Sequence, residues 1–351
     1  MKLISNNLDK PAIGEIWILL DSRLFGGIES HVIELARGLI AFGNKARVVL
    51  TTEYSPAAQI VQKQKKPRSL VTTICLASPI KLKLNTQAPS PITNSVVHSH
   101  GYKASILSRC AKLLTRTFPR LISTYHAGES SSGKLWLYDW LDRSSGCLSD
   151  HCFAVSPSIQ RKVFCSSELL NNFVSIPNSQ LNYQEIAFVG RLSQEKGADQ
   201  FIEVARLCPT LQFSVYGDGP EKESLNQTAP SNVTFLGHQT DMEGVWENIS
   251  VLIISSRYEG LPMAALEAMS RGIAVMSLRV GRLPDIIQTG KNGFIVEDIP
   301  SLAKCLHDWI SIGEAQQSLI RQNARQTIID DFSAQSVIPV LLQKYQIETD
   351  H

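Results

Sequence analysis

Short apolar runs alternate with amphipathic stretches along most of this chain of 351 residues. Apolar runs bounded by polar turns are typical of buried parallel strands, and apolar residues spaced three and four apart predict helices between them. This alternation predicts an α/β fold with doubly wound parallel sheets. The expected strands are 14–20, 46–51, 95–100, 121–125, 152–155, 186–189, 212–216, 233–235, 251–254, 273–277 and 294–296.

The chain is longer than a single hydrophobic core usually supports, so two domains are expected. The alternation of strands and helices stops around residues 176–182 and restarts at residue 186. We therefore expect an N-terminal domain over residues 1–179, a C-terminal domain over residues 180–331 and a terminal helical segment over residues 332–351.

The segment Arg257–Glu267 is the most informative part of the chain. It follows the apolar run 251–254, and Pro262 suits the first turn of a helix, where its missing N–H costs nothing. A loop and a helix start at the carboxyl end of a parallel strand form an anion site. Glu259 and Glu267 flank this site. The arrangement suits a ligand with phosphates in its middle and hydroxyl groups at both ends, such as a nucleotide sugar.

A second strand–turn–helix element carries two cations, Arg191 and Lys196, after the strand 186–189. The helix dipole disfavours cations at the start of a helix, so a bound anion explains them better than a solvated surface does. The two elements together predict a site for a diphosphate.

These elements, with Gly217–Pro220 and Asn232–Gly237, resemble the C-terminal half of the family 4 glycosyltransferases, which have the GT-B fold. Three further segments, Phe25–Glu29, Ser123–Gly128 and Ser175–Asn178, resemble the N-terminal half. The resemblance implies two Rossmann-like domains that face a central cleft. In such an arrangement the N-terminal domain binds the acceptor, the C-terminal domain binds the nucleotide sugar, and the terminal helix crosses back to the first domain.

The resemblance also implies roles for single residues. Glu267 would accept hydrogen bonds from the ribose hydroxyls, and Glu259 from hydroxyls of the transferred sugar. Arg191 and Lys196 would neutralise the diphosphate as it leaves, and His126 would line the sugar pocket. The expected catalytic residues are Arg191, Lys196, Glu259 and His126, and the expected donor-binding residues are Gly26, Gly27, Arg191, Lys196, Gly260, Leu261, Pro262, Met263 and Glu267.

His98 and His100 alternate on the strand 95–100, so we expect only one of them to face the cleft. Their spacing could suit a metal, but no third ligand is apparent and no Asp-x-Asp motif is present. Positive charge comes instead from Arg191, Lys196 and the helix N-termini. We therefore expect no metal and no cofactor, with the nucleotide diphosphate sugar as a co-substrate.

One segment departs from the family pattern. Relatives commonly carry a glycine pair, a proline and an acid after the strand that ends near Ser277, whereas this chain has Arg282 in place of the second glycine. Arg282 could crowd the site, reshape it or add a cation to it. The identity of the donor sugar nucleotide stays open for this reason.

Charge is distributed unevenly: residues 1–181 hold 21 Lys and Arg against 11 Asp and Glu, and residues 182–351 hold 13 against 21. The basic half favours a lipid-linked or otherwise anionic glycan acceptor and peripheral contact with the inner membrane surface, although a solvated surface is the alternative. Part of the basic excess comes from Lys63, Lys65, Lys66, Arg68, Lys81 and Lys83.

We expect cytoplasmic localisation, reduced cysteines, no signal peptide, no membrane span and no nucleic-acid partner.

The expected activity is retaining transfer of a hexose-type sugar from a nucleotide diphosphate donor, in bacterial cell-surface polysaccharide or lipopolysaccharide assembly. One alternative is an epimerase or hydrolase on the same fold, which would turn over without an acceptor. Another is a non-catalytic protein that binds sugar nucleotides. A nicotinamide-dependent oxidoreductase is disfavoured, because Lys222 replaces the third glycine of the dinucleotide motif that starts at Gly217.

Overall fold

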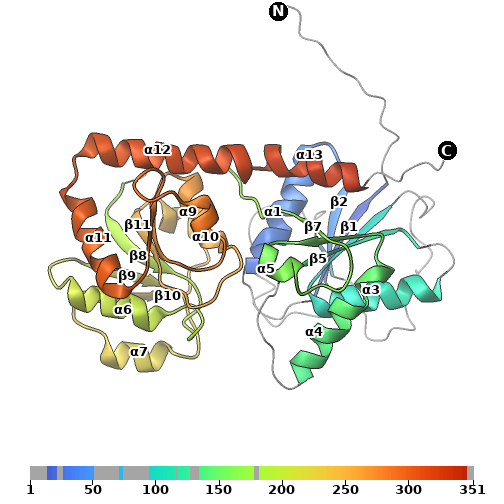
Figure 1. Cartoon of the computed structure of the whole chain (residues 1–351), viewed down its shortest axis with the longest axis horizontal. Helices are drawn as coiled ribbons and strands as arrows, with labels where there is room; N and C mark the ends of the chain where they lie inside the picture. The colour runs from blue at the N-terminus through green and yellow to red at the C-terminus, as the bar shows by residue number, and fades with distance from the viewer. Residues whose placement is uncertain are drawn as a thin grey trace, which may run out of the picture.

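The computed structural model describes residues 14–21, 27–50, 71–73, 95–115, 118–126, 134–177 and 182–345. These residues form two lobes, each built on its own sheet, and Figure 1 shows the lobes side by side. Every strand pair within the described residues is parallel. The expected α/β architecture with two parallel sheets is confirmed.

The first lobe contains a seven-stranded sheet in the order β3-β2-β1-β4-β5-β6-β7. Its central strand, β4, is buried at all of its positions, as a parallel strand covered on both faces should be. The strands are β1 (Ile16–Leu20), β2 (Ala46–Leu50), β3 (Val71–Thr73), β4 (Val96–His100), β5 (Arg120–Tyr125), β6 (His151–Ala154) and β7 (Glu168–Leu169). The helices are α1 (Gly27–Ala41), α3 (Tyr102–Leu114), α4 (Lys134–Ser144), η3 (Gly146–Leu148) and α5 (Pro157–Gln160).

The second lobe contains a six-stranded sheet in the order β10-β9-β8-β11-β12-β13. The strands are β8 (Glu185–Val189), β9 (Phe213–Tyr216), β10 (Val233–Gly237), β11 (Ile249–Ile254), β12 (Ala274–Leu278) and β13 (Phe294–Val296). The helices are α6 (Ala198–Leu207), α7 (Lys222–Thr228), α8 (Met242–Trp246), α9 (Met263–Ser270), α10 (Leu283–Ile286) and α11 (Ile299–Ser311). Apolar side chains fill both faces of this sheet in two core clusters.

Two consecutive helices join the lobes along one side of the molecule (Figure 1). The first, α12 (Glu314–Asp331), buries Ala324 and Ile328 in the core of the second lobe. The second, α13 (Ala334–Tyr345), buries Ile338 and Leu341 among the apolar side chains of β1 and α1. Helix α13 is therefore part of the first hydrophobic core.

Candidate active site

Each sheet reverses its strand order at one point. In the second lobe the reversal lies between β8 and β11, which pair directly, and in the first lobe it lies between β1 and β4. Loops diverge at such a point and leave a crevice at the carboxyl ends of the strands, where open α/β sheets bind their ligands. The loops after β8 and β11 carry the charged residues that the sequence analysis selected, and the first-lobe histidines lie at or just after the ends of β4 and β5.

Lys196 and Glu259 come from these two loops and form an ion pair. The Lys196 ammonium lies 2.7 Å from Glu259 Oε1, and the Ser256 hydroxyl donates to the same oxygen at 2.8 Å. The Glu259 side chain is 9% exposed and that of Lys196 is 31% exposed. Two groups predicted from separate motifs are therefore in direct contact, and an anion that binds Lys196 would compete with Glu259.

Backbone contacts hold the two loops together. Gly197 has φ +64°, and a Cβ on it would lie only 2.1 Å from the carbonyl oxygen of Ser255. The Ser255 hydroxyl donates to the Gly197 carbonyl at 2.7 Å, and the Arg257 N–H donates to the Glu195 carbonyl at 2.8 Å. Glycine is required at position 197 because any side chain would push the loops apart.

Arg191 is exposed and lies on the same loop after β8 as Lys196. Within the described residues its guanidinium makes no hydrogen bond and no ion pair, in contrast to Arg257, which binds Asp199 through two bonds of 2.7 and 2.6 Å. An arginine can bind a phosphate through two parallel hydrogen bonds. Contact of Arg191 with an anionic ligand stays a prediction of the sequence analysis.

The residues before α9 serve a structural role as well. Pro262 is the N-cap residue of α9, so the helix begins one position later than we expected. The side chains of Leu261 and Met263 are buried in the core of the second lobe. Any contact of Leu261 or Met263 with a ligand must therefore come from backbone N–H groups at the helix start.

Glu267 lies on α9, partly buried, near the boundary between the lobes. Burial raises the pKa of its carboxyl to about 7, the nearby Arg271 lowers it, and Glu34 on α1 of the first lobe raises it further. Glu34 is itself held by the backbone N–H of Ser175, at 3.0 Å. Without a ligand, the carboxyl of Glu267 is therefore partly protonated near pH 7.

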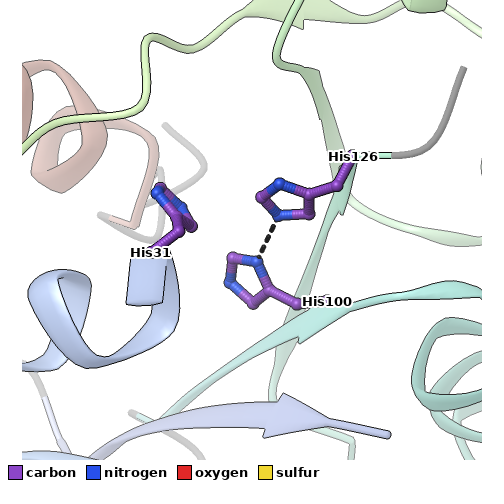
Figure 2. A group of neighbouring side chains, drawn as sticks. All are labelled: His31, His100 and His126. Atoms are coloured by element: carbon purple, nitrogen blue, oxygen red, sulfur yellow. Dashed lines mark hydrogen bonds between the residues drawn. The ribbon is translucent and has the colours of Figure 1, made fainter. Parts of the chain in front are cut away.

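Three histidines of the first lobe converge from different elements, as Figure 2 shows. His31 lies on α1, His100 ends β4 and His126 follows β5. His100 Nδ1 and His126 Nε2 are hydrogen-bonded at 2.8 Å, and the His31 ring centroid lies 5.5 and 5.0 Å from those of His100 and His126. Burial lowers the pKa of His31 to about 4 and those of His100 and His126 well below their usual value. All three imidazoles are therefore neutral near pH 7.

The expected alternation of His98 and His100 across the strand is wrong, although only His100 belongs to the histidine cluster. His98 and His100 lie on the same side of β4, with ring centroids 4.2 Å apart, because side chains two positions apart on a strand share a face. His98 instead binds Tyr345 of α13 at 2.6 Å and Thr124 at 2.7 Å.

The sequence analysis found no third ligand beside His98 and His100, and the structure instead groups His100 with two histidines from other elements. Ring nitrogens of His31, His100 and His126 lie within 4.8 Å of one another. Neutral imidazole is a good zinc ligand, but a metal would first have to displace the hydrogen bond between His100 and His126. The sequence signal for His31 was weak, since it is one polar residue on an amphipathic helix.

The loop between β11 and α9, residues 255–262, which we call the donor loop after its expected ligand, approaches the histidines of the first lobe. A Cβ on Gly260 would lie 4.0 Å from the carbonyl oxygen of His126 and 3.9 Å from the side chain of Ile159. Gly260 of the second lobe therefore lies beside the backbone of His126 of the first. Gly26 lies outside the described residues, as do Asn178 and the basic residues between 63 and 83, and of Gly27 only the helical backbone is described.

Comparisons with known proteins agree with this architecture. The family described as "Glycosyltransferase Family 4" matches residues 25–165, and "Glycosyl transferases group 1" matches residues 183–311. The poly(ribitol-phosphate) alpha-N-acetylglucosaminyltransferase of Staphylococcus aureus is 26% identical over 48% of this chain and 37% of its own length. The lipopolysaccharide core biosynthesis glycosyltransferase LpsE of Rhizobium meliloti is 25% identical over 44% of this chain and 47% of its own. The match to this chain thus spans less than half of each of these relatives.

Among solved structures, HepE of Anabaena in complex with UDP and glucose superposes with a TM-score of 0.75 at 17% identity, covering 93% of this chain and 98% of that one. This similarity shows that the two lobes form a GT-B fold. The two family matches together span most of both lobes, and the chain belongs to the family 4 type of glycosyltransferases.

The raised pKa of Glu267 predicts pH-dependent donor binding. A carboxylate accepts ribose hydroxyl bonds with both oxygens, so affinity should fall as the pH drops below about 7, by up to about tenfold per pH unit. Calorimetry with a nucleotide diphosphate sugar at about pH 6 and about pH 8 measures this, because such a diphosphate does not titrate in that range. Glu267→Gln should bind more weakly and lose the pH dependence. An unchanged pH dependence in this variant would exclude Glu267 as its source.

Proposed function

We propose that this protein transfers a hexose-type sugar from a nucleotide diphosphate sugar to a glycan acceptor with retention of configuration. The observation that carries the proposal is the contact of Lys196 with Glu259 at the β8/β11 reversal, with Arg191 exposed on the same loop as Lys196. A diphosphate would bind the two cations and leave Glu259 to accept bonds from sugar hydroxyls. The N-acetylglucosaminyltransferase relative and the HepE structure with UDP and glucose support a hexose-type donor.

The cations act on the leaving group. Negative charge develops on the diphosphate as its bond to the sugar breaks, and positioned cations stabilise that charge selectively in the transition state. Arg191 and Lys196 provide two such cations, and the N–H groups at the start of α9 add the positive end of a helix dipole. Catalysis then consists mainly of positioning and electrostatic stabilisation.

The first lobe adds neutral groups. Because burial keeps the pKa of His126 well below its usual value, this imidazole can hydrogen-bond a sugar hydroxyl without adding a further charge. Glu259 is already bound by Lys196 and Ser256, which suits an acceptor of hydroxyl bonds better than a nucleophile. The departing diphosphate therefore helps to deprotonate the acceptor on the same face of the sugar, and the configuration is retained.

Loss of either cation should slow the transfer step. We expect Arg191→Ala and Lys196→Ala each to lower kcat by roughly 10²–10³, the usual cost of removing a group that stabilises transition-state charge. Initial rates with saturating nucleotide sugar and acceptor measure this, after a thermal-shift screen of UDP, GDP and ADP sugars has identified the donor. Lys304→Ala is the control, because Lys304 is an exposed lysine on α11 that pairs only with Asp308 of the same helix, at 2.7 Å.

Two outcomes would contradict this assignment. Near wild-type kcat in Lys196→Ala would show that Lys196 does not contact the leaving group. Turnover of the nucleotide sugar that is fast without any acceptor would favour the hydrolase or epimerase alternative over transfer.

Transfer should not require a divalent metal. Arg191, Lys196 and the start of α9 already supply the positive charge that a metal would provide. We expect full activity in EDTA, measured against an untreated sample. Loss of activity that added Mg²⁺ or Mn²⁺ restores would contradict the proposed charge balance.

We also propose that the acceptor is lipid-linked or anionic and that the first lobe meets it at a membrane surface. The LpsE relative is named for lipopolysaccharide core biosynthesis, and the first half of the chain carries the basic excess. Helix α4 adds apolar surface, since Trp136 and Trp140 are 57% and 46% exposed. Tryptophans of this kind favour the interface of a bilayer. None of the helices in the described part of the chain is long and apolar enough to cross a membrane.

Membrane contact should be reversible by salt. Each basic residue near an anionic leaflet contributes about 1 kcal/mol, screened beyond the Debye length, so co-sedimentation with anionic vesicles should fall at high salt. Trp136→Ser/Trp140→Ser should lower the bound fraction, as should neutralisation of Lys63, Lys65, Lys66 and Arg68. Ile310→Ser is the control, because Ile310 is 48% exposed on α11 of the second lobe. No binding to anionic vesicles would contradict the proposal.

A further inference from the structure

Arg282 lies where the family pattern has a glycine, and its backbone is fixed against the donor loop. The preceding Gly281 has φ +56°, and a Cβ on it would lie 2.4 Å from the carbonyl oxygen of Gly260 and 2.8 Å from that of Glu259. The N–H of Arg282 donates to the same Gly260 carbonyl at 2.9 Å. The start of the Arg282 side chain is therefore placed by the loop that carries Glu259 and Gly260.

The side chain of Arg282 leaves the second lobe and contacts the first. Its Nη1 donates to Asn171 Oδ1 at 2.9 Å and to the carbonyl oxygen of Val155 at 3.2 Å. Val155 directly follows β6, and Asn171 lies two residues after β7. Partial burial lowers the pKa of Arg282 and the nearby Asp285 raises it, while the oxygens that accept its hydrogen bonds across the boundary are neutral.

Asn171 extends the contact to the point where the chain returns to the first lobe. Its Nδ2 donates to the carbonyl oxygen of Asp331, at 3.3 Å, at the end of α12. Close by, the Val174 N–H donates to the Phe332 carbonyl at 3.0 Å, and Val174 bridges Ser333 as an isolated β-bridge. Asn171 therefore joins Arg282 to the junction between α12 and α13.

We propose that Arg282 is a positioning residue that couples the donor loop to the first lobe and, through Asn171, to the α12–α13 junction. In this role the guanidinium sets where Glu259 and Gly260 lie relative to His126 and the acceptor side. A glycine at position 282 would lack the hydrogen bonds that join the donor loop to Val155 and Asn171 of the first lobe. The functional part of this inference rests on the proposed transfer reaction, whereas the coupling itself is a property of the protein without ligand.

Amide hydrogen exchange of the ligand-free protein tests the coupling directly. Arg282→Met keeps the length of the side chain but removes its donors, and it should speed exchange in peptides covering 256–262, 170–175 and 329–334. We expect at least about tenfold, the loss typical of a hydrogen bond to a charged group. Arg282→Lys should recover part of the protection, since an ammonium can reach one acceptor. Arg279→Met is the matched control, because Arg279 lies in the same turn but pairs with Glu297 of its own lobe at 2.7 Å.

Two substitutions at Asn171 distinguish its hydrogen bond with Arg282 from its hydrogen bond with Asp331. Asn171→Asp keeps an oxygen for Arg282 but loses the donor to Asp331, so the donor loop should stay protected while the junction peptide 329–334 exchanges faster. Asn171→Ala should speed exchange in both the donor loop and the junction peptide 329–334. If Arg282→Met leaves exchange unchanged, or if Arg279→Met alters it equally, the proposal is wrong.

Kinetics then test the consequence for transfer. Affinity for the nucleoside diphosphate alone should stay within about twofold in Arg282→Met, because the proposed contacts come from the second lobe, while kcat falls about tenfold. Weakened nucleotide binding with unchanged kcat would overturn the positioning role. A failure of the proposed transfer reaction itself would appear as inactivity of the wild type and would leave the exchange result intact.

Discussion

The close approach of the β8 and β11 loops is the constraint on which the second-lobe site depends. Gly197 has no side chain, so its backbone can lie against Ser255, and the two loops exchange hydrogen bonds there. Only this approach brings Lys196 from one loop to Glu259 of the other. A side chain at position 197 would therefore act on charge placement as well as on packing, because the cation and the carboxylate would separate.

The two lobes present different electrostatic environments to the boundary between them. The second lobe presents Arg191, Lys196 and the start of α9, all positive, and the ionisable Glu267. The first lobe has buried imidazoles that stay neutral because burial disfavours their charged form and so lowers their pKa values. In the proposed function a diphosphate is attracted to the second lobe, where it takes Lys196 from Glu259, and a sugar held at Gly260 meets the neutral side.

The sequence predicted local features well and long-range contacts poorly. Arg191, Lys196, Glu259 and Glu267 each stand in a strand–loop–helix segment whose pattern is visible within about a dozen residues, and parallel strands bring the ends of such segments to one edge. His31 was missed because its partners are 69 and 95 positions away in the chain numbering. His98 and His100 were separated wrongly, although the two-residue period of a strand places them together. The partner of Arg282 depends on a contact between lobes, which no local pattern encodes.

Contacts between the lobes follow from how the chain returns to its first core. Helix α13 buries Ile338 and Leu341 with α1, and Tyr345 at its end binds His98, whose ring lies against His100. His100 in turn holds His126, the residue opposite Gly260. The α12–α13 junction thus has two roles. Asn171 links this junction to Arg282, and α13, which begins there, supports the histidines through Tyr345. Packing of the last helix is in this way a condition for the geometry of both halves of the site, although α13 itself contributes no group to it.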